Sequence, residues 1–163
     1  MDSDLQLSPA PAGFEPEFID ALTDIFERQI AFNQVIGIEI TRIAPDCVEA
    51  SIGMKPELVG HFAYNRVHGG VISAALDAMA GLAVMAAIGA RHMDEPPARR
   101  LQRFARLGTI DLRIDYLRPA IGPRFRQRAQ VLRLGSRVAT ARMEFLSARD
   151  ELLSVGTASY IVS

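Results

Sequence analysis

The sequence predicts an α+β domain in which a curved antiparallel sheet wraps around one long central helix, with an extra helix at the N-terminus. The stretch 69–90 is apolar or small at nearly every position, which is typical of a helix buried on most of its sides. Segments before and after it alternate between apolar and polar residues, the period of half-buried strands. Residues 15–32 repeat their apolar residues at helical spacing instead, which predicts the extra helix.

The alternating pattern predicts two strands before the central helix and four after it. A lone apolar helix needs covering on its sides, and one strongly curved sheet can provide that cover. In the third strand, Ile110, Leu112, Ile114 and Tyr116 are expected to share one face, opposite Thr109. Turns are predicted at 44–46 and at 135–136, and loops at 55–68 and 91–106. The alternating positions of the other strands are Ile36, Ile38, Ile40; Val48, Ala50, Ile52, Met54; Phe125, Gln127, Ala129, Val131; Ala139, Ala141, Met143, Phe145; and Gly156, Ala158, Tyr160, Val162.

The length of 163 residues favours a single domain. Residues 1–14 are expected to be a flexible N-terminus, and residues 15–163 one domain that includes the N-terminal helix. The single cysteine, Cys47, has no partner for an intrachain disulfide, and the first residues lack the basic and apolar regions of a signal peptide. We therefore expect a cytoplasmic protein.

Charge and hydropathy argue against nucleic acid and membranes as partners. The formal net charge is -1, without the basic excess that nucleic acid or an anionic membrane surface favours. The stretch 69–90 is long enough to cross a bilayer. It is rich in Ala and Gly, however, and carries Asp77 near its middle, which is costly in lipid. We expect no membrane insertion.

Asp77 is the ionisable residue inside the central helix, and it is the first candidate for catalysis. A buried carboxylate costs several kcal/mol unless it is paired or hydrogen-bonded. In a partly dry cleft it would serve as a general base or a nucleophile. The structural alternative is an aspartate on the wet edge of the helix, or one whose charge a neighbouring backbone group satisfies.

The tripeptide His68–Gly69–Gly70 is expected to open the same helix. The first amides of a helix have no internal partners, and together with the helix dipole they attract anions. Glycines allow close approach, which suits a developing oxyanion on a thioester carbonyl. The alternative is a simple loop-to-helix turn with a histidine that only caps or packs.

The spacing of these two features indicates a site shared between chains. Gly69 and Asp77 are eight positions apart, so along one helix they are separated by ~12 Å. A single carbonyl cannot touch both. If both act on one substrate, two helices from two chains must lie antiparallel, and the protein must be at least a dimer.

Other polar residues indicate chemistry less clearly. His61 and Asn65 lie in the loop before the central helix and are candidates for substrate contact, although a solvated loop residue is the more common explanation of each. Arginines at 99, 100, 103 and 106 and at 124, 126 and 128 are candidates for phosphate binding, although a solvated surface is the more common explanation of such residues. The sequence has no G-x-S-x-G, P-loop or G-x-G-x-x-G motif. It also has no cluster with metal-ligand spacing, so no metal is expected.

The segment from His68 to Asp77, an HGG motif with a helical aspartate at this interval, resembles the phenylacetate-pathway (PaaI-like) thioesterase family. The run from Thr109 to Ala120 is similar to the family's third strand with its Y-x-x-P ending. The resemblance covers about residues 35–162. It implies the hotdog fold, a homodimer or homotetramer joined at sheet edges, and hydrolysis of acyl-CoA without a cofactor.

The resemblance also implies roles for particular residues. Asp77 would be the base or nucleophile, and Gly69 would give the oxyanion amide from the opposite subunit. His68 would help to hold the thioester end, with Gly70, His61 and Asn65 as further substrate contacts. Thr109 would position water. Many relatives carry an asparagine where this chain has His61, which leaves the polarisation of the substrate and the substrate range open.

We therefore expect a thioesterase acting on medium-chain, long-chain or aromatic acyl-CoA. Two alternatives stay open. One is a hotdog dehydratase or hydratase, although the histidine and acidic residue arrangement of those enzymes is not found. The other is a non-catalytic acyl-CoA sensor, although residues 15–33 offer one helix and not a DNA-binding helix-turn-helix.

Overall fold

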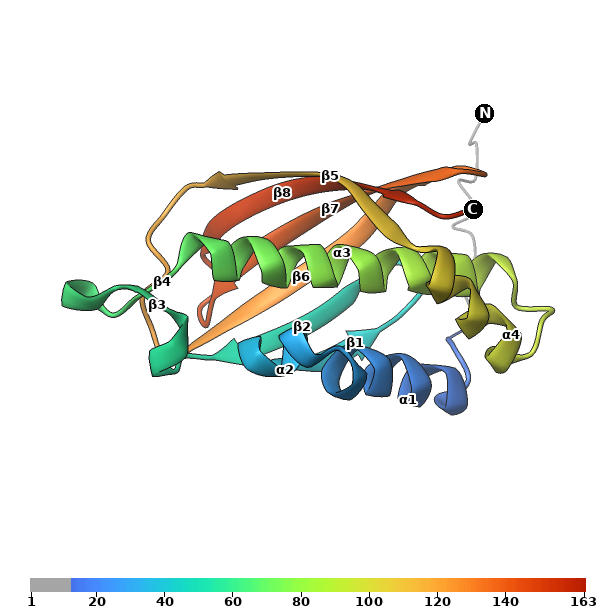
Figure 1. The fold of residues 1–163 in the computed structure, drawn as a ribbon, viewed down its shortest axis with the longest axis horizontal. Helices are drawn as coiled ribbons and strands as arrows, with labels where there is room; N and C mark the ends of the chain where they lie inside the picture. The colour runs from blue at the N-terminus through green and yellow to red at the C-terminus, as the bar shows by residue number, and fades with distance from the viewer. Residues whose placement is uncertain (1–12) are drawn as a thin grey trace, which may run out of the picture.

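The computed structural model describes residues 13–163, and in this part of the chain six antiparallel strands form one sheet (Figure 1). The order across the sheet is β1-β2-β6-β7-β8-β5, so β5 and β1 are its edges. The strands are β1 (Ile38–Ile43), β2 (Val48–Gly53), β5 (Gly108–Tyr116), β6 (Arg124–Leu134), β7 (Val138–Ser147) and β8 (Leu152–Ile161). The predicted two-plus-four arrangement of strands around a central helix is confirmed.

The central helix α3 (Gly69–Arg91) lies along the sheet, as Figure 1 shows. The small residues Ala139 and Ala141 of β7 are completely buried, and small side chains let sheet and helix pack closely. Within residues 13–163, α3 is the helix with the length and apolar composition of a membrane span, and 67% of its most apolar window is buried inside the protein. Burial against the sheet accounts for this composition.

The predicted N-terminal helix is present, but it is broken into three pieces. Helix α1 (Pro16–Asp24) continues into a π-helical turn, η1 (Ile25–Gln29), and α2 (Ala31–Ile36) follows. Ile30, between η1 and α2, adopts an extended conformation. The side-chain amide of Asn33 donates to the carbonyl of Phe26 at 2.9 Å, which satisfies a group that the break would leave without a partner.

The predicted boundary between N-terminal helix and first strand lies too early. Ile36 ends α2, and Gly37 takes a left-handed conformation with φ 81°, a common way to end a helix. The strand therefore starts at Ile38. At the other end, Phe14 is buried and packs on Phe18 with ring centroids 4.9 Å apart, so the core begins inside the segment predicted to be flexible. Residues 1–12 of that segment lie outside the described residues.

The two predicted loops contain short regular elements. Residues 55–68 hold η2 (Pro56–Leu58), β3 (Val59–His61), η3 (Phe62–Tyr64) and β4 (Arg66–Val67), and β3 pairs with β4. The hairpin that they form projects from the end of the molecule at which α3 begins (Figure 1). Residues 91–106 hold α4 (Pro97–Leu101) and η4 (Gln102–Arg106). These pieces are too short to show periodicity in the sequence.

Arg100, one of the candidate phosphate ligands, is a structural residue. Its side chain is fully buried, donates to Glu15 Oε2 at 2.6 Å, and places its guanidinium carbon 4.4 Å from the centre of the Phe18 ring. Hydrogen bonding to Arg100 lowers the pKa of Glu15. Arg100 thus fastens α1 to α4, and burial explains why it is not available to a ligand.

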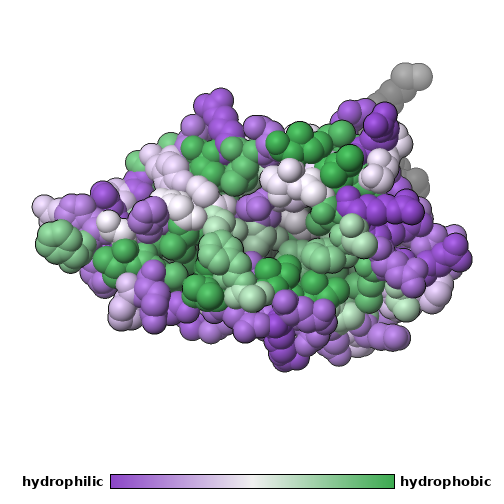
Figure 2. Space-filling model, in the orientation of Figure 1, coloured by the Kyte–Doolittle hydropathy of each residue, from purple (hydrophilic) through white to green (hydrophobic). Residues whose placement is uncertain are grey.

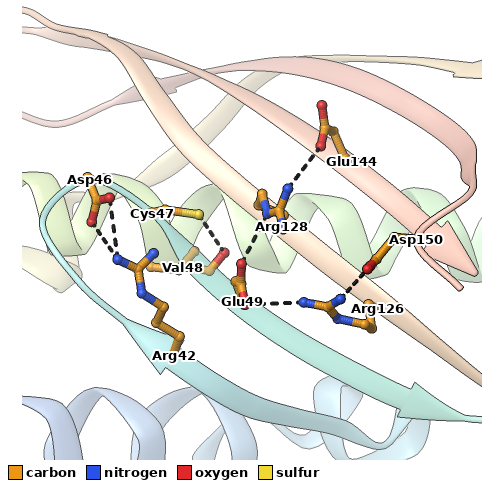
Figure 3. A network of polar contacts seen from close by, with 9 residues as sticks. All are labelled: Arg42, Asp46, Cys47, Val48, Glu49, Arg126, Arg128, Glu144 and Asp150. Carbon is orange, nitrogen blue, oxygen red and sulfur yellow. Dashed lines mark hydrogen bonds and ion pairs between the residues drawn. The ribbon is translucent and has the colours of Figure 1, made fainter. Parts of the chain in front are cut away.

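The arginines of β6 are also engaged within the chain. Figure 3 shows Arg126 between Glu49 and Asp150, and Arg128 between Glu49 and Glu144. Arg124 pairs with Glu39 at 2.6 Å. Because these side chains alternate with the buried residues of β6, the network lies on the side of the sheet away from α3. The paired carboxylates neutralise these arginines, and the sheet separates the arginines from the polar residues of α3.

Candidate active site

Asp77 lies on α3 opposite two hydroxyl groups from neighbouring strands. Thr109 Oγ1, on β5, donates to Asp77 Oδ1 at 3.0 Å. The hydroxyl of Tyr160, on β8, lies 2.6 Å from the main-chain oxygen of Asp77 and also contacts Oδ1. Thr109 and Tyr160 are register partners in the β5–β8 ladder, so the sheet delivers both to the same carboxylate. Oδ2 accepts no hydrogen bond from residues 13–163, which leaves one oxygen available for chemistry.

A β-bulge explains how Thr109 reaches Asp77. The β5–β8 register shifts between Thr109 and Asp111, so Ile110 is the extra residue. The prediction that Ile110 shares a face with Leu112 and Ile114 is wrong: Ile110 is 57% exposed. A bulge re-aims the side chains on one side of it, and here it turns Thr109 inward. Strict alternation would have pointed Thr109 away from the helix.

Tyr160 is the site residue that sequence reasoning missed. It fits the alternating pattern of its strand, and it is 3% exposed, so it reads as ordinary core. Burial, and next the hydrogen bond to Asp77, raise the pKa of Tyr160 above its ordinary value. The hydroxyl therefore remains a proton donor to Asp77 across the neutral range. The sequence offers only a general indication of this contact, because any buried tyrosine hydroxyl needs a hydrogen-bond partner.

An apolar groove of about 270 Å³ adjoins Asp77. It runs between α3, the N-terminal helical segment, η4 and the start of β5. Besides Asp77, Thr109 and Tyr160, its lining includes Phe26, Ile30, Phe32, Gly81, Phe104 and Leu107. The carboxylate therefore stands at the edge of a mostly hydrophobic recess, as expected for a site that receives a substrate with an apolar part.

His68 caps the start of α3. Its Nδ1 accepts a hydrogen bond from the Gly70 N–H at 2.8 Å, which in a neutral imidazole leaves the proton on Nε2. The Gly70 amide is thereby engaged within the chain. The Gly69 amide donates to no acceptor among the described residues, in keeping with the free amides of a first helical turn. Of the two glycine amides considered from the sequence, Gly69 is the one open to an anion.

Tyr116 holds this end of the helix in place. Its hydroxyl donates to the carbonyl oxygen of Gly69 at 2.9 Å and also contacts Ser73 Oγ. The Y-x-x-P segment is thus tied to the HGG turn. A cavity of about 490 Å³ opens here, lined by residues that include Arg66, His68 and Gly69.

The two candidate groups of the site are not brought together within one chain. Gly69 begins α3 and Asp77 follows eight residues later in the same helix, which separates them by ~12 Å along the axis. Each lines a different cavity, and neither of these two cavities includes the other group. The structure of one chain therefore agrees with the premise of the two-chain prediction.

His61 and Asn65 lie beyond the start of α3, in the projecting hairpin. The His61 ring packs against Phe62 and Tyr64 at centroid distances of 5.8 and 4.9 Å. Asn65 takes a left-handed conformation with φ 49° and is exposed. Neither residue lines the groove at Asp77 or the cavity at Gly69 of its own chain. Within residues 13–163, no three His, Cys, Asp or Glu side chains gather as a metal site would require.

Comparisons with known proteins agree with this architecture. The family model described as "Thioesterase superfamily" matches residues 64–154. The medium/long-chain acyl-CoA thioesterase YigI of Escherichia coli K12 is 37% identical over 139 residues, which are 85% of this chain and 90% of YigI. This chain belongs to the thioesterase superfamily.

Solved structures show the same fold. A Shewanella oneidensis protein described as related to the thioesterase superfamily superimposes with a TM-score of 0.84 at 36% identity, covering 92% of this chain and 100% of that one. Zebrafish thioesterase superfamily member 2 gives a TM-score of 0.71 at 18% identity, covering 92% and 99%, a likeness of fold alone. The predicted hotdog fold is confirmed.

Proposed function

We propose that this protein hydrolyses the thioester bond of acyl-CoA, releasing a free acid and CoA, with medium-chain, long-chain or aromatic acyl groups as substrates. The observation that carries the proposal is the Asp77 carboxylate. It lines an apolar groove, with one oxygen held by two hydroxyls and the other without a hydrogen bond from the described residues. The likeness to the Escherichia coli enzyme, named for medium- and long-chain acyl-CoA, supports the same substrate class.

Asp77 acts on the thioester carbonyl in one of two ways. As a general base it takes a proton from water while the water oxygen adds to the carbonyl carbon. As a nucleophile its free oxygen forms a mixed anhydride, which water then cleaves. In both cases the C–S bond breaks, and the CoA sulfur leaves as a thiolate that takes up a proton. Thr109 and Tyr160 hold the carboxylate, and in this proposal Thr109 also orients water.

The developing oxyanion needs a donor that Asp77 cannot supply. The Gly69 amide of a second subunit fills this role if two α3 helices lie antiparallel. His68 Nε2 would then face the thioester, with Gly70, His61 and Asn65 as further substrate contacts. This arrangement corresponds to the PaaI-like type of thioesterase site, which needs no metal or other cofactor.

The surface beside α3 supports such a dimer. Strand β5 is a sheet edge, and an open edge presents unpaired backbone groups that favour pairing with another strand. Ile110 and Tyr116 on this strand are 57% and 51% exposed. Figure 2 shows apolar residues across the middle of the face on which α3 is seen, with hydrophilic residues around the rim. We propose a homodimer or homotetramer of domains spanning residues 15–163, located in the cytoplasm.

A panel of acyl-CoA substrates tests the function. Trapping of the released thiol should show faster turnover of octanoyl-, lauroyl- or phenylacetyl-CoA than of acetyl-CoA, because the groove at Asp77 is apolar. Binding of acyl-CoA without thiol release would indicate a sensor. Hydration or dehydration of the acyl chain with the thioester intact would indicate the other hotdog chemistry, and either result would contradict the proposal.

Loss of the Tyr160 hydroxyl should slow hydrolysis. Hydrogen bonds to charged groups contribute ~1.5–3 kcal/mol, so Tyr160→Phe is expected to lower kcat by roughly 10- to 100-fold. Thr157→Val removes an exposed hydroxyl from the same strand, at a position outside the groove, and serves as the control with unchanged kcat. Equal kcat values for Tyr160→Phe and the wild type would show that the contact with Asp77 has no part in the reaction.

A further inference from the structure

Gly81 lies one helical turn beyond Asp77 on α3, on the same side of the helix. It lines the same groove as the carboxylate, about 6 Å further along the axis. A methyl group built on Gly81 would come within 3.6 Å of Leu107 and within 3.8 Å of Phe26 and Tyr160. These three residues all line the same groove. Any side chain at position 81 would therefore project into the groove.

Packing does not explain a glycine at this position. Gly89, further along α3, has a steric reason, because an added methyl group would lie 2.5 Å from the ring of Phe18. At Gly81 the same addition makes ordinary van der Waals contacts. A glycine inside a helix is less stable than alanine by roughly 0.5–1 kcal/mol. Glycine at position 81 therefore makes the helix less stable than alanine would, and it leaves space in the groove.

The groove offers that space to an apolar group. One wall comes from the N-terminal helical segment through Phe26, Ile30 and Phe32, and the opposite wall from η4 and Leu107. Asn33 also lines it, but its side-chain amide is engaged by the carbonyl of Phe26. Away from Asp77, Thr109, Tyr160 and Asn33, the lining side chains are therefore apolar. The groove is continuous with the carboxylate, so its occupant is the group attached to the reacting carbonyl.

We propose that Gly81 sets the length of acyl chain that this enzyme accepts, with the N-terminal helical segment and Leu107 as the walls of the acyl site. The assignment rests on the proposed thioesterase function. The carbonyl carbon lies at Asp77, and the hydrocarbon chain runs past Gly81 between Phe26 and Leu107. A larger residue at position 81 shortens the groove beside Leu107, Phe26 and the ring of Tyr160. Because Tyr160 also contacts Asp77, the test measures binding and not turnover.

The test measures binding of a series of S-alkyl-CoA thioethers, from butyl through octyl and dodecyl to hexadecyl, by calorimetry. Gly81→Val is expected to weaken dodecyl- and hexadecyl-CoA by about 10- to 200-fold relative to butyl-CoA, and Gly81→Ala less. Leu107→Phe fills the same space from the opposite wall and should give the same pattern if Gly81→Val fails to fold. Gly53→Ala, at a position with no atom nearer than 4.0 Å to the added methyl group, should bind as the wild type does.

A length dependence in folded Gly81→Val and Leu107→Phe identical to that of the wild type would overturn the assignment. Equal weakening for every chain length would also overturn it, and so would wild-type protein that binds none of the thioethers. Thiol release from lauroyl-CoA is measured on the same wild-type preparation. If release is absent while Gly81→Val still discriminates by length, the proposed hydrolysis fails and the acyl site stands.

Discussion

Asp77→Asn is expected to keep the fold and to lose about 10²- to 10⁴-fold in kcat, the range that a general base contributes. The amide oxygen of asparagine can replace Asp77 Oδ1 as acceptor for the hydroxyls of Thr109 and Tyr160. The amide nitrogen then stands where the free oxygen was. The substitution thus preserves the hydrogen bonds that place residue 77 and removes the atom that reacts.

Melting temperature and turnover of the Asp77→Asn variant must be measured on the same preparation. A melting temperature close to the wild type together with the loss of kcat supports a chemical role. If Asp77 is only structural, the outcome reverses, and the variant loses thermal stability while its folded fraction hydrolyses acyl-CoA at a near-normal rate. That reversed outcome would remove Asp77 from the mechanism.

Gly69→Pro is expected to lower kcat by about 10²- to 10³-fold, the effect of removing one oxyanion donor. Proline lacks the N–H and is well tolerated at the first position of a helix. Gly69 holds that position in α3, and the preceding His68 has the extended conformation, φ -65° and ψ 135°, that a residue before proline prefers. The helix start is therefore compatible with the substitution.

The matched control is Gly69→Ala, which retains the N–H. Its added methyl group would lie 3.4 Å from the Tyr116 ring, an ordinary contact. This variant should keep most of the wild-type kcat. Equal losses in the two variants would assign the effect to crowding against Tyr116, and equal activity of Gly69→Pro and the wild type would exclude the Gly69 amide as the oxyanion donor.

The architecture could be predicted because its signals are periodic. The apolar run of α3 and the alternation of the strands depend on which side chains face the core, and the core dominates stability. Asp77 could be identified as a candidate because a carboxylate inside an apolar run is costly unless it is paired or hydrogen-bonded. The HGG tripeptide was informative because glycines at a helix start leave amides open. The cap that His68 forms engages the Gly70 amide within the chain, as the structural alternative expected, so the prediction of an open amide now rests on Gly69.

Features that depend on exact register or on distant partners could not be predicted. The bulge at Ile110 shifts β5 by one residue, and no local pattern marks it. Arg100 resembles a surface arginine in sequence, because its partner Glu15 lies 85 positions away. Tyr160 reads as core for the same reason, because its contact with Asp77 spans 83 positions. Tertiary contacts of this kind override the average preferences of a residue type.

The most direct test of the shared site mixes the two inactive variants. Hetero-dimers of Asp77→Asn and Gly69→Pro subunits, isolated with two different affinity tags, contain one site with both groups intact and one with neither. We expect such hetero-dimers to recover about half of the wild-type activity per dimer, since the two sites of a symmetric dimer are equivalent. Folded hetero-dimers that are no more active than either parent would show that Asp77 and Gly69 do not meet across a subunit interface.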